Sequence, residues 1–108
     1  MTENSRVGRF MTFKAQAGRG DELASAMLTV AEGLRGFPGC EAYLISQDRA
    51  DADTVHVLEV WADDDAADAA LRAAQAAADA PVGISDVLAM LADRPQRVDF
   101  VPRGGVGF

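Results

Sequence analysis

The sequence predicts an α+β fold of order βαββαβ, in which helices cover one face of a four-stranded antiparallel sheet. Two observations predict it. Short segments rich in β-branched and aromatic residues are typical of strands, and apolar residues recur at helical spacing in the segments between them. Glycine, proline and aspartate gather at the junctions, as turns and helix starts require.

The first strand and the first helix are predicted between residues 7 and 34. Apolar residues lie at both odd and even positions of 7–17, so both faces of this segment are apolar, as expected of a mostly buried strand. Gly18-Arg19-Gly20 breaks this strand, and Asp21-Glu22 places negative charge at a helix start, where the helix macrodipole favours it. The helix then shows apolar residues at helical spacing, namely Leu23, Ala26, Met27, Val30, Ala31 and Leu34.

A strand hairpin is predicted next. Gly36-Phe37-Pro38-Gly39 ends the first helix with residues that are typical of helix ends and turns. Two strands follow, 40–47 and 54–61, and the polar segment 48–53 connects them. The second of these strands ends in the only tryptophan of the chain.

The remaining elements are a second helix, a short third helix and a last strand. Asp63 to Asp65 opens the second helix, and ten of the fifteen residues from Ala66 to Ala80 are alanine. Alanine favours a helix but buries little area, which fits either genomic composition bias or a space left for a ligand. A helix through 85–91 and a strand at 98–101 complete the split βαβ pattern of ferredoxin-like folds.

Length and composition set the class of protein. At 108 residues we expect one domain, 1–108, with a flexible tail at 103–108. A net charge of −7 without a basic patch disfavours nucleic acid and anionic membranes as partners. The single cysteine, Cys40, and the absence of a long apolar run in the sequence favour a cytoplasmic location.

Strand parity predicts a sheet face that no helix covers. Its expected members are apolar apart from a threonine and a histidine: Phe10, Thr12, His56, Leu58 and Val60. Because such a surface is too apolar to remain in water, we expect a homodimer in which two sheets face each other. The only histidine, His56, is expected inside that dimer, and His56 with Cys40 lacks the converging partners that a metal site needs.

Glu59 and Trp61 lie on the same side of the strand 54–61, in a row that should otherwise be buried. A buried carboxylate requires a partner, because burying it alone costs several kcal/mol. Glu59 therefore marks either a ligand pocket or a structural tie, and Tyr43, Arg97 or a backbone amide could donate to it. We favour the structural tie over a general base.

Three segments resemble the antibiotic biosynthesis monooxygenase family: Phe10 to Leu23, Phe37 to Tyr43 with its Pro-Gly-Cys turn, and Val57 to Asp63 with its Glu-x-Trp strand end. The resemblance implies a dimeric α/β barrel with a pocket between sheet and helices in each subunit. It also implies activities such as cofactor-independent oxygenation of aromatic polyketides, quinol oxidation or haem degradation. The haem-binding histidine of the second helix has no counterpart here, since no histidine follows His56.

By this resemblance, Trp61 corresponds to the tryptophan that lines the pocket in other members of the family. Tyr43 is the second candidate catalytic residue, because its polar tip needs a partner when buried. Where other members carry a first-strand asparagine this sequence has Met11, and the second helix offers alanine and Leu71 in place of a polar residue. Residues expected to line a substrate pocket, or simply the subunit core, are Met11, Phe13, Leu71, Leu88, Leu91 and Phe100.

These observations lead to two hypotheses about function. The first is a monooxygenase without metal or other cofactor that acts on an aromatic polyketide-like phenol or quinol. The second is a non-catalytic dimer of the same fold that binds a small molecule or has a structural role. A self-partner through the sheet faces and an aromatic small molecule are the expected partners.

Overall fold

The structure is a computed structural model, and it describes residues 5–77, 80 and 82–107. Expectations that concern residues 78, 79, 81 and Phe108 lie outside the described residues. The elements are β1 (Val7–Lys14), α1 (Gly20–Gly33), β2 (Cys40–Gln47), β3 (Thr54–Trp61), α2 (Asp64–Ala76), α3 (Ile84–Ala89) and β4 (Gln96–Phe100).

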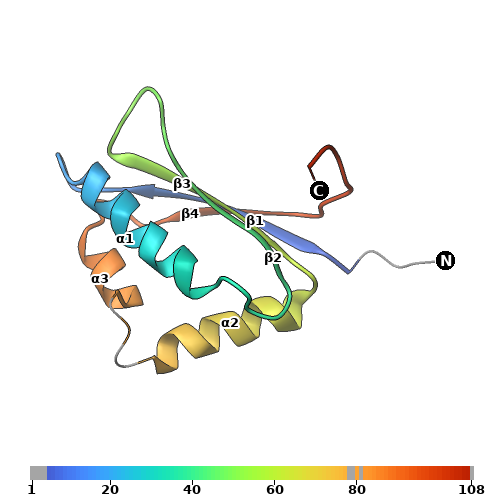
Figure 1. The fold of residues 1–108 in the computed structure, drawn as a ribbon. Helices are drawn as coiled ribbons and strands as arrows, with labels where there is room; N and C mark the ends of the chain where they lie inside the picture. The colour runs from blue at the N-terminus through green and yellow to red at the C-terminus, as the bar shows by residue number, and fades with distance from the viewer. Residues whose placement is uncertain (1–4, 78–79, 81, 108) are drawn as a thin grey trace.

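The strands form one sheet in the order β2-β3-β1-β4, and every neighbouring pair is antiparallel. α1, α2 and α3 lie together on one side of this sheet, and none of the described helices lies on the other (Figure 1). We call these the covered face and the uncovered face. The predicted α+β, ferredoxin-like fold is confirmed.

Several element ends differ from the sequence prediction, among them those of β1, β4, α2 and α3, which runs over Ile84–Ala89. β1 ends at Lys14 because the next two amides leave the sheet: Ala15 donates to the carbonyl of Asp53, and Gln16 to that of Met90. β4 begins earlier than expected, because Gln96 pairs with Thr12 of β1. The α2 helix ends at Ala76, before the predicted end of the alanine-rich run.

The turn between β1 and α1 is fixed by close packing against the β2–β3 connection. A Cβ atom added at Gly20 would lie 1.8 Å from the carbonyl oxygen of Ala52. The carboxylate of Asp53 accepts hydrogen bonds from the amides of Gly18 at 3.1 Å and Gly20 at 2.9 Å. The bond from Gly20 satisfies an amide that the start of α1 leaves without an intrahelical partner, and the bond from Gly18 fixes the turn before it.

Two apolar clusters lie between the sheet and the helices. The larger one packs α1 and α3 on the sheet, and its buried members are Phe13, Ala15, Leu23, Ala26, Met27, Val55, Val57 and Val87. The smaller one consists of Trp61 with Ala67 and Ala70 of α2. Asp63 caps α2, because its carboxylate accepts from the amide of Ala66 at 2.8 Å. α2 is therefore docked on the sheet by its first half.

The uncovered face carries an apolar row that crosses all four strands. Strand pairing aligns Leu44, Leu58, Phe10 and Val98. Of these, Leu44 is 56% exposed, Val98 60% and Phe10 37%. Beside the row, the ring of His56 stacks on that of Phe10, with centroids 5.4 Å apart.

His56 links two strands to the β2–β3 connection on this uncovered face. One ring nitrogen lies 3.3 Å from the hydroxyl of Thr12, and the other lies 2.9 Å from a carboxylate oxygen of Asp48. This contact with His56 is the largest cause of a lowered Asp48 pKa.

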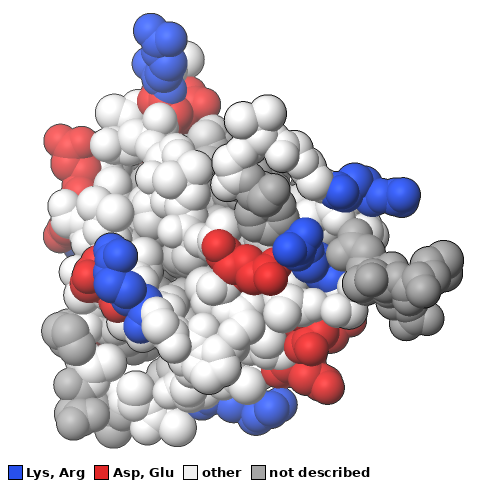
Figure 2. Space-filling view, turned by 45° about the vertical axis from the view of Figure 1, so that its right-hand side comes forward, with Lys and Arg blue, Asp and Glu red and all other residues white. Residues whose placement is uncertain are grey.

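Figure 2 shows charged side chains of both signs scattered over one side of the molecule, with uncharged areas between them. Several of these charges form ion pairs at the surface, for example Arg6 with Glu41 and Arg35 with Glu32, each at 2.8 Å. Exposed pairs of this kind contribute little to stability. Among the described residues, no helix has the length and apolarity needed to cross a bilayer.

Candidate functional site

Trp61 is placed at the end of β3, directly under α2. It is 2% exposed, and Ala67 and Ala70 of α2 pack on it. The ring of Phe37 meets the indole edge-on, with centroids 6.3 Å apart and an interplanar angle of 86°. The alanines of α2 thus let the helix approach closely enough to bury a large ring completely.

Glu59 holds the indole in position. The Nε1–H of Trp61 donates to Oε1 of Glu59 at 2.9 Å, and Glu59 itself is only 8% exposed. The two residues can meet because positions i and i+2 of a strand point to the same face. The donor is therefore the neighbouring indole, which was not among the partners that the sequence suggested.

Tyr43 lies opposite Glu59 on β2 and packs against both apolar clusters of the covered face. Burial, and secondarily the negative charge of Glu59, raises the pKa of the Tyr43 hydroxyl well above its usual range. The hydroxyl therefore stays protonated at neutral pH and can donate. It has no hydrogen bond to any residue that the structure describes.

Cys40 lies beside Trp61, its pairing partner on β3. Burial, with a smaller effect of the Glu59 charge, raises the pKa of the Cys40 thiol. A raised pKa leaves little thiolate at neutral pH, so that this cysteine is a weak nucleophile. Within residues 5–77, 80 and 82–107, no three His, Cys, Asp or Glu side chains gather as ligands of a metal ion would.

The residues expected to line a pocket are placed in three different environments. Phe13 is buried in the larger cluster, with Met11 and Leu91 partly buried against it. Leu71 of α2 and Leu88 of α3 are 48% and 52% exposed. The ring of Phe100 lies over Gly8, where an added Cβ would approach the ring to 2.2 Å. Strand parity puts this contact on the uncovered face, so that Phe100 lies across the sheet from the others.

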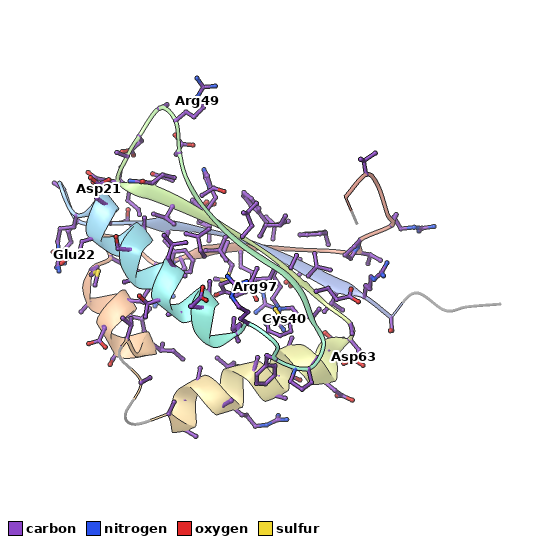
Figure 3. All side chains as sticks on the ribbon, in the orientation of Figure 1. Asp21, Glu22, Cys40, Arg49, Asp63 and Arg97 are labelled. Atoms are coloured by element: carbon purple, nitrogen blue, oxygen red, sulfur yellow. The ribbon has the colours of Figure 1, made fainter. Side chains whose placement is uncertain are left out.

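A hollow of about 260 Å³ lies at the edge of the covered face, between β1, β4 and the first turn of α2. Its walls combine apolar residues with two arginines and two aspartates: Val7, Gly8, Arg9, Asp64, Arg97, Asp99, Phe100 and Val101. Figure 3 shows Arg97 on the helix side of the sheet. Arg97 Nε donates to Asp99 at 2.7 Å, which raises the Arg97 pKa, and the charges of Glu59 and Asp64 add to this.

Sequence reasoning missed the polar part of this hollow. The sequence did contain an indication of it: Arg9 alternates with Val7 and Met11 along the strand and therefore shares their face of the sheet. A charged residue in such a row requires either a partner or a ligand. By contrast, Arg49 lies at the tip of the β2–β3 connection, away from the hollow (Figure 3).

Solved structures of other proteins share this fold. A proposed antibiotic biosynthesis monooxygenase of Chloroflexus aurantiacus J-10-fl is 26% identical, with a TM-score of 0.74, and the match covers 95% of this chain and 98% of that one. A second, from Nitrosomonas europaea, is 15% identical with a TM-score of 0.78, covering 99% and 96%. SnoaB of Streptomyces nogalater, a cofactor-independent oxygenase solved as a point mutant, is 17% identical with a TM-score of 0.71, covering 96% and 99%.

The family follows from the sequence match. A family model described as antibiotic biosynthesis monooxygenase matches residues 6–78, which is more than half of the chain. This protein therefore belongs to the antibiotic biosynthesis monooxygenase family, as the three sequence segments predicted. No curated protein matches the chain.

Proposed function

We propose that this protein is a monooxygenase that uses molecular oxygen to oxidise an aromatic phenol or quinol without a metal or flavin. The main support for the proposal is that two aromatic side chains, Trp61 and Tyr43, pack together on the covered face of a chain that belongs to the monooxygenase family. Trp61 supplies a buried ring under α2, and Tyr43 supplies a protonated hydroxyl without a partner among the described residues. SnoaB, which shares the fold, is an oxygenase that works without a cofactor.

The proposed reaction requires a hydrogen-bond donor to the substrate oxygen rather than a general base from the protein. The phenol loses its proton to solvent water, the resulting electron-rich phenolate reacts with oxygen, and a hydrogen bond to the phenolate oxygen stabilises and orients the anion. Tyr43 can supply that bond, because its raised pKa keeps the proton on the tyrosine. In the oxidation of a naphthol to a naphthoquinone, one oxygen atom becomes the new carbonyl. The other leaves as water with two substrate hydrogens, so that four electrons pass from the substrate to oxygen.

Oxygen uptake tests the proposal. Chelator-treated protein would be incubated with a panel of naphthols, quinols and anthrones at an oxygen electrode, with matched buffer blanks for autoxidation. We expect at least one compound to consume oxygen above its blank, with an uptake rate that Tyr43→Phe lowers. Leu28→Ala, at a 56% exposed position on α1, is the matched control. Uptake equal to the blank for every compound, or equal in wild type and Tyr43→Phe, would refute the proposal.

One observation favours the second hypothesis, a dimer that binds a ligand without turnover. The Nε1–H of Trp61 is already engaged by Glu59, so that the tryptophan offers a ligand only its ring. A thermal-shift measurement alongside the oxygen electrode separates the two. A rise in melting temperature with an aromatic compound, without oxygen uptake, is the result that the binding hypothesis predicts.

We also propose that the uncovered face pairs with that of a second copy of this chain. The support is the exposed apolar row, which none of the described helices covers and which water would otherwise contact. Leu44→Glu with Val98→Glu should convert a dimer to a monomer in sedimentation velocity, because both side chains are exposed and the fold tolerates the change. Leu28→Glu, equally exposed on α1, should leave the dimer intact. A monomeric wild type would overturn this proposal.

A further inference from the structure

The hollow at the β1–β4 edge contains a cation, Arg9, that has no partner among the residues that the structure describes. Arg9 is partly buried on the covered face and lines the hollow together with Arg97, Asp99 and Asp64. The side chain of Arg9 makes no hydrogen bond and no ion pair with any described residue. No buried side-chain nitrogen of the described residues lacks a partner, so the Arg9 guanidinium contacts water and its N–H donors are free to bind a ligand in place of that water.

The two carboxylates nearest to Arg9 in the sheet are both engaged elsewhere. Strand pairing places Glu59 of β3 on one side of Arg9 and Asp99 of β4 on the other. Glu59 accepts from the indole of Trp61 at 2.9 Å, and Asp99 accepts from Arg97 at 2.7 Å. Within the described part of the chain, Arg9 thus lies between two acids, each of which has another donor, and pairs with neither.

The charges of the hollow define the kind of anion that it accepts. Arg97 and Asp99 neutralise each other as an ion pair. Arg9 remains as the cation without an ion pair to a described residue, while Asp64 in the first turn of α2 and Glu59, whose indole donor is neutral, disfavour a second negative charge on the ligand. A planar group with two oxygens and a single charge matches the guanidinium fork, which favours a carboxylate over a phosphate dianion.

The hollow also adjoins the aromatic site. Val7 lines the hollow and packs against the cluster of Trp61, with which it pairs in the sheet. We propose that Arg9 binds the carboxylate of an aromatic hydroxy acid, whose ring extends past Val7 toward Trp61. This inference rests on the proposed function, because it names the substrate class of the same covered face.

A pair of probes tests the inference. 2-Naphthol and 6-hydroxy-2-naphthoate share a bicyclic ring and a hydroxyl, and only the second carries a carboxylate, at the far end from the hydroxyl. Calorimetric titration should give about tenfold tighter binding of the naphthoate, as expected for one charge-assisted bidentate contact. Raising the salt concentration should weaken binding of the naphthoate and leave that of the naphthol unchanged.

Two arginine variants isolate the contact. Arg9→Gln should remove the tenfold preference while leaving the affinity for 2-naphthol unchanged. Arg49→Gln, which removes the same charge at the tip of the β2–β3 connection, should retain the preference. Far-UV circular dichroism checks that both variants fold.

Each outcome decides between the two proposals. Equal affinity of wild type for the two probes, or an unchanged preference in Arg9→Gln, overturns the carboxylate site and leaves the oxygenase proposal standing. Loss of the preference in Arg49→Gln also overturns it, because the effect would then reflect overall charge. If neither probe binds to wild type while another phenol of the oxygen-electrode panel is consumed, the carboxylate site alone fails. If no compound binds or is consumed, both proposals fail.

Discussion

Replacing Trp61 by phenylalanine should destabilise the protein by about 2.5–4 kcal/mol. The change removes the hydrogen bond from Nε1 to Glu59, and hydrogen bonds to charged groups contribute about 1.5–3 kcal/mol. The smaller phenylalanine ring buries less apolar surface, which costs about 1 kcal/mol more of stability because the indole is 2% exposed and packed beneath α2. The loss is large against the stability of about 5–15 kcal/mol that is usual for a domain.

A double-mutant cycle separates the hydrogen bond from the ring. Glu59→Gln retains an oxygen acceptor and removes a buried charge, so that the two effects oppose each other and the net change should stay below about 1 kcal/mol. Trp61→Phe should then cost about 1–2 kcal/mol less in the Glu59→Gln background than in wild type.

Urea unfolding followed by far-UV circular dichroism provides the assay, because the tryptophan itself is one of the changed residues. Protein concentration must be equal throughout, since any dimerisation couples to stability. A Trp61→Phe variant within about 0.5 kcal/mol of wild type, or a coupling energy near zero, would show that the Glu59–Trp61 contact is not a structural tie.

Three further predictions follow from the fold and the site. Gly20→Ala should lower the free energy of unfolding by about 1–3 kcal/mol, because its Cβ would lie 1.8 Å from the carbonyl oxygen of Ala52; Gly33→Ala, with open space around it, should be neutral or stabilising in the same urea titration. Asp51→Asn should lower the melting temperature at pH 7, and the difference from wild type should shrink as the pH falls through the folded-state pKa of Asp51. The hydrogen bond from Lys14 holds that pKa below its usual range, so the stabilisation is present above the usual range and is lost in acid. A pH-independent difference would contradict this. Tyr43→Phe should lower oxygen uptake about a hundredfold if the Tyr43 hydroxyl stabilises the phenolate. The urea midpoint should stay nearly unchanged, because no hydrogen bond to a described residue is lost. A large loss of stability would contradict this.

The elements could be predicted from the sequence because their signals are local. The glycines around Arg19 and the acids from Asp63 to Asp65 mark the starts of both long helices, and α1 and α2 begin there. Strand pairing places all five residues predicted for the uncovered face, Phe10, Thr12, His56, Leu58 and Val60, at positions of that face, although Val60 is only 5% exposed. The ends of elements shifted by a few residues, in strands because long-range hydrogen bonds decide where pairing begins and stops.

The side-chain partners within the site could not be predicted in the same way. Glu59 could reach donors on three strands, and the sequence does not state which rotamer the neighbouring indole adopts. Leu71 could have pointed inward or outward, because a helix made mostly of alanine has no apolar stripe that fixes its rotation. That Arg9 has no acid partner could not be predicted, because it depends on the strand pairing that places Glu59 and Asp99 beside it and on the other donors that bind these two acids.

Isotope labelling tests the oxygenase proposal most directly. Chelator-treated protein would oxidise an active phenol of the oxygen-electrode panel under ¹⁸O₂, and the product would be analysed by mass spectrometry at early times, before quinone carbonyls exchange with water. The proposal predicts one ¹⁸O atom in each quinone product and the second in water. A product without ¹⁸O, or labelling that is equal in the absence of protein, would contradict it.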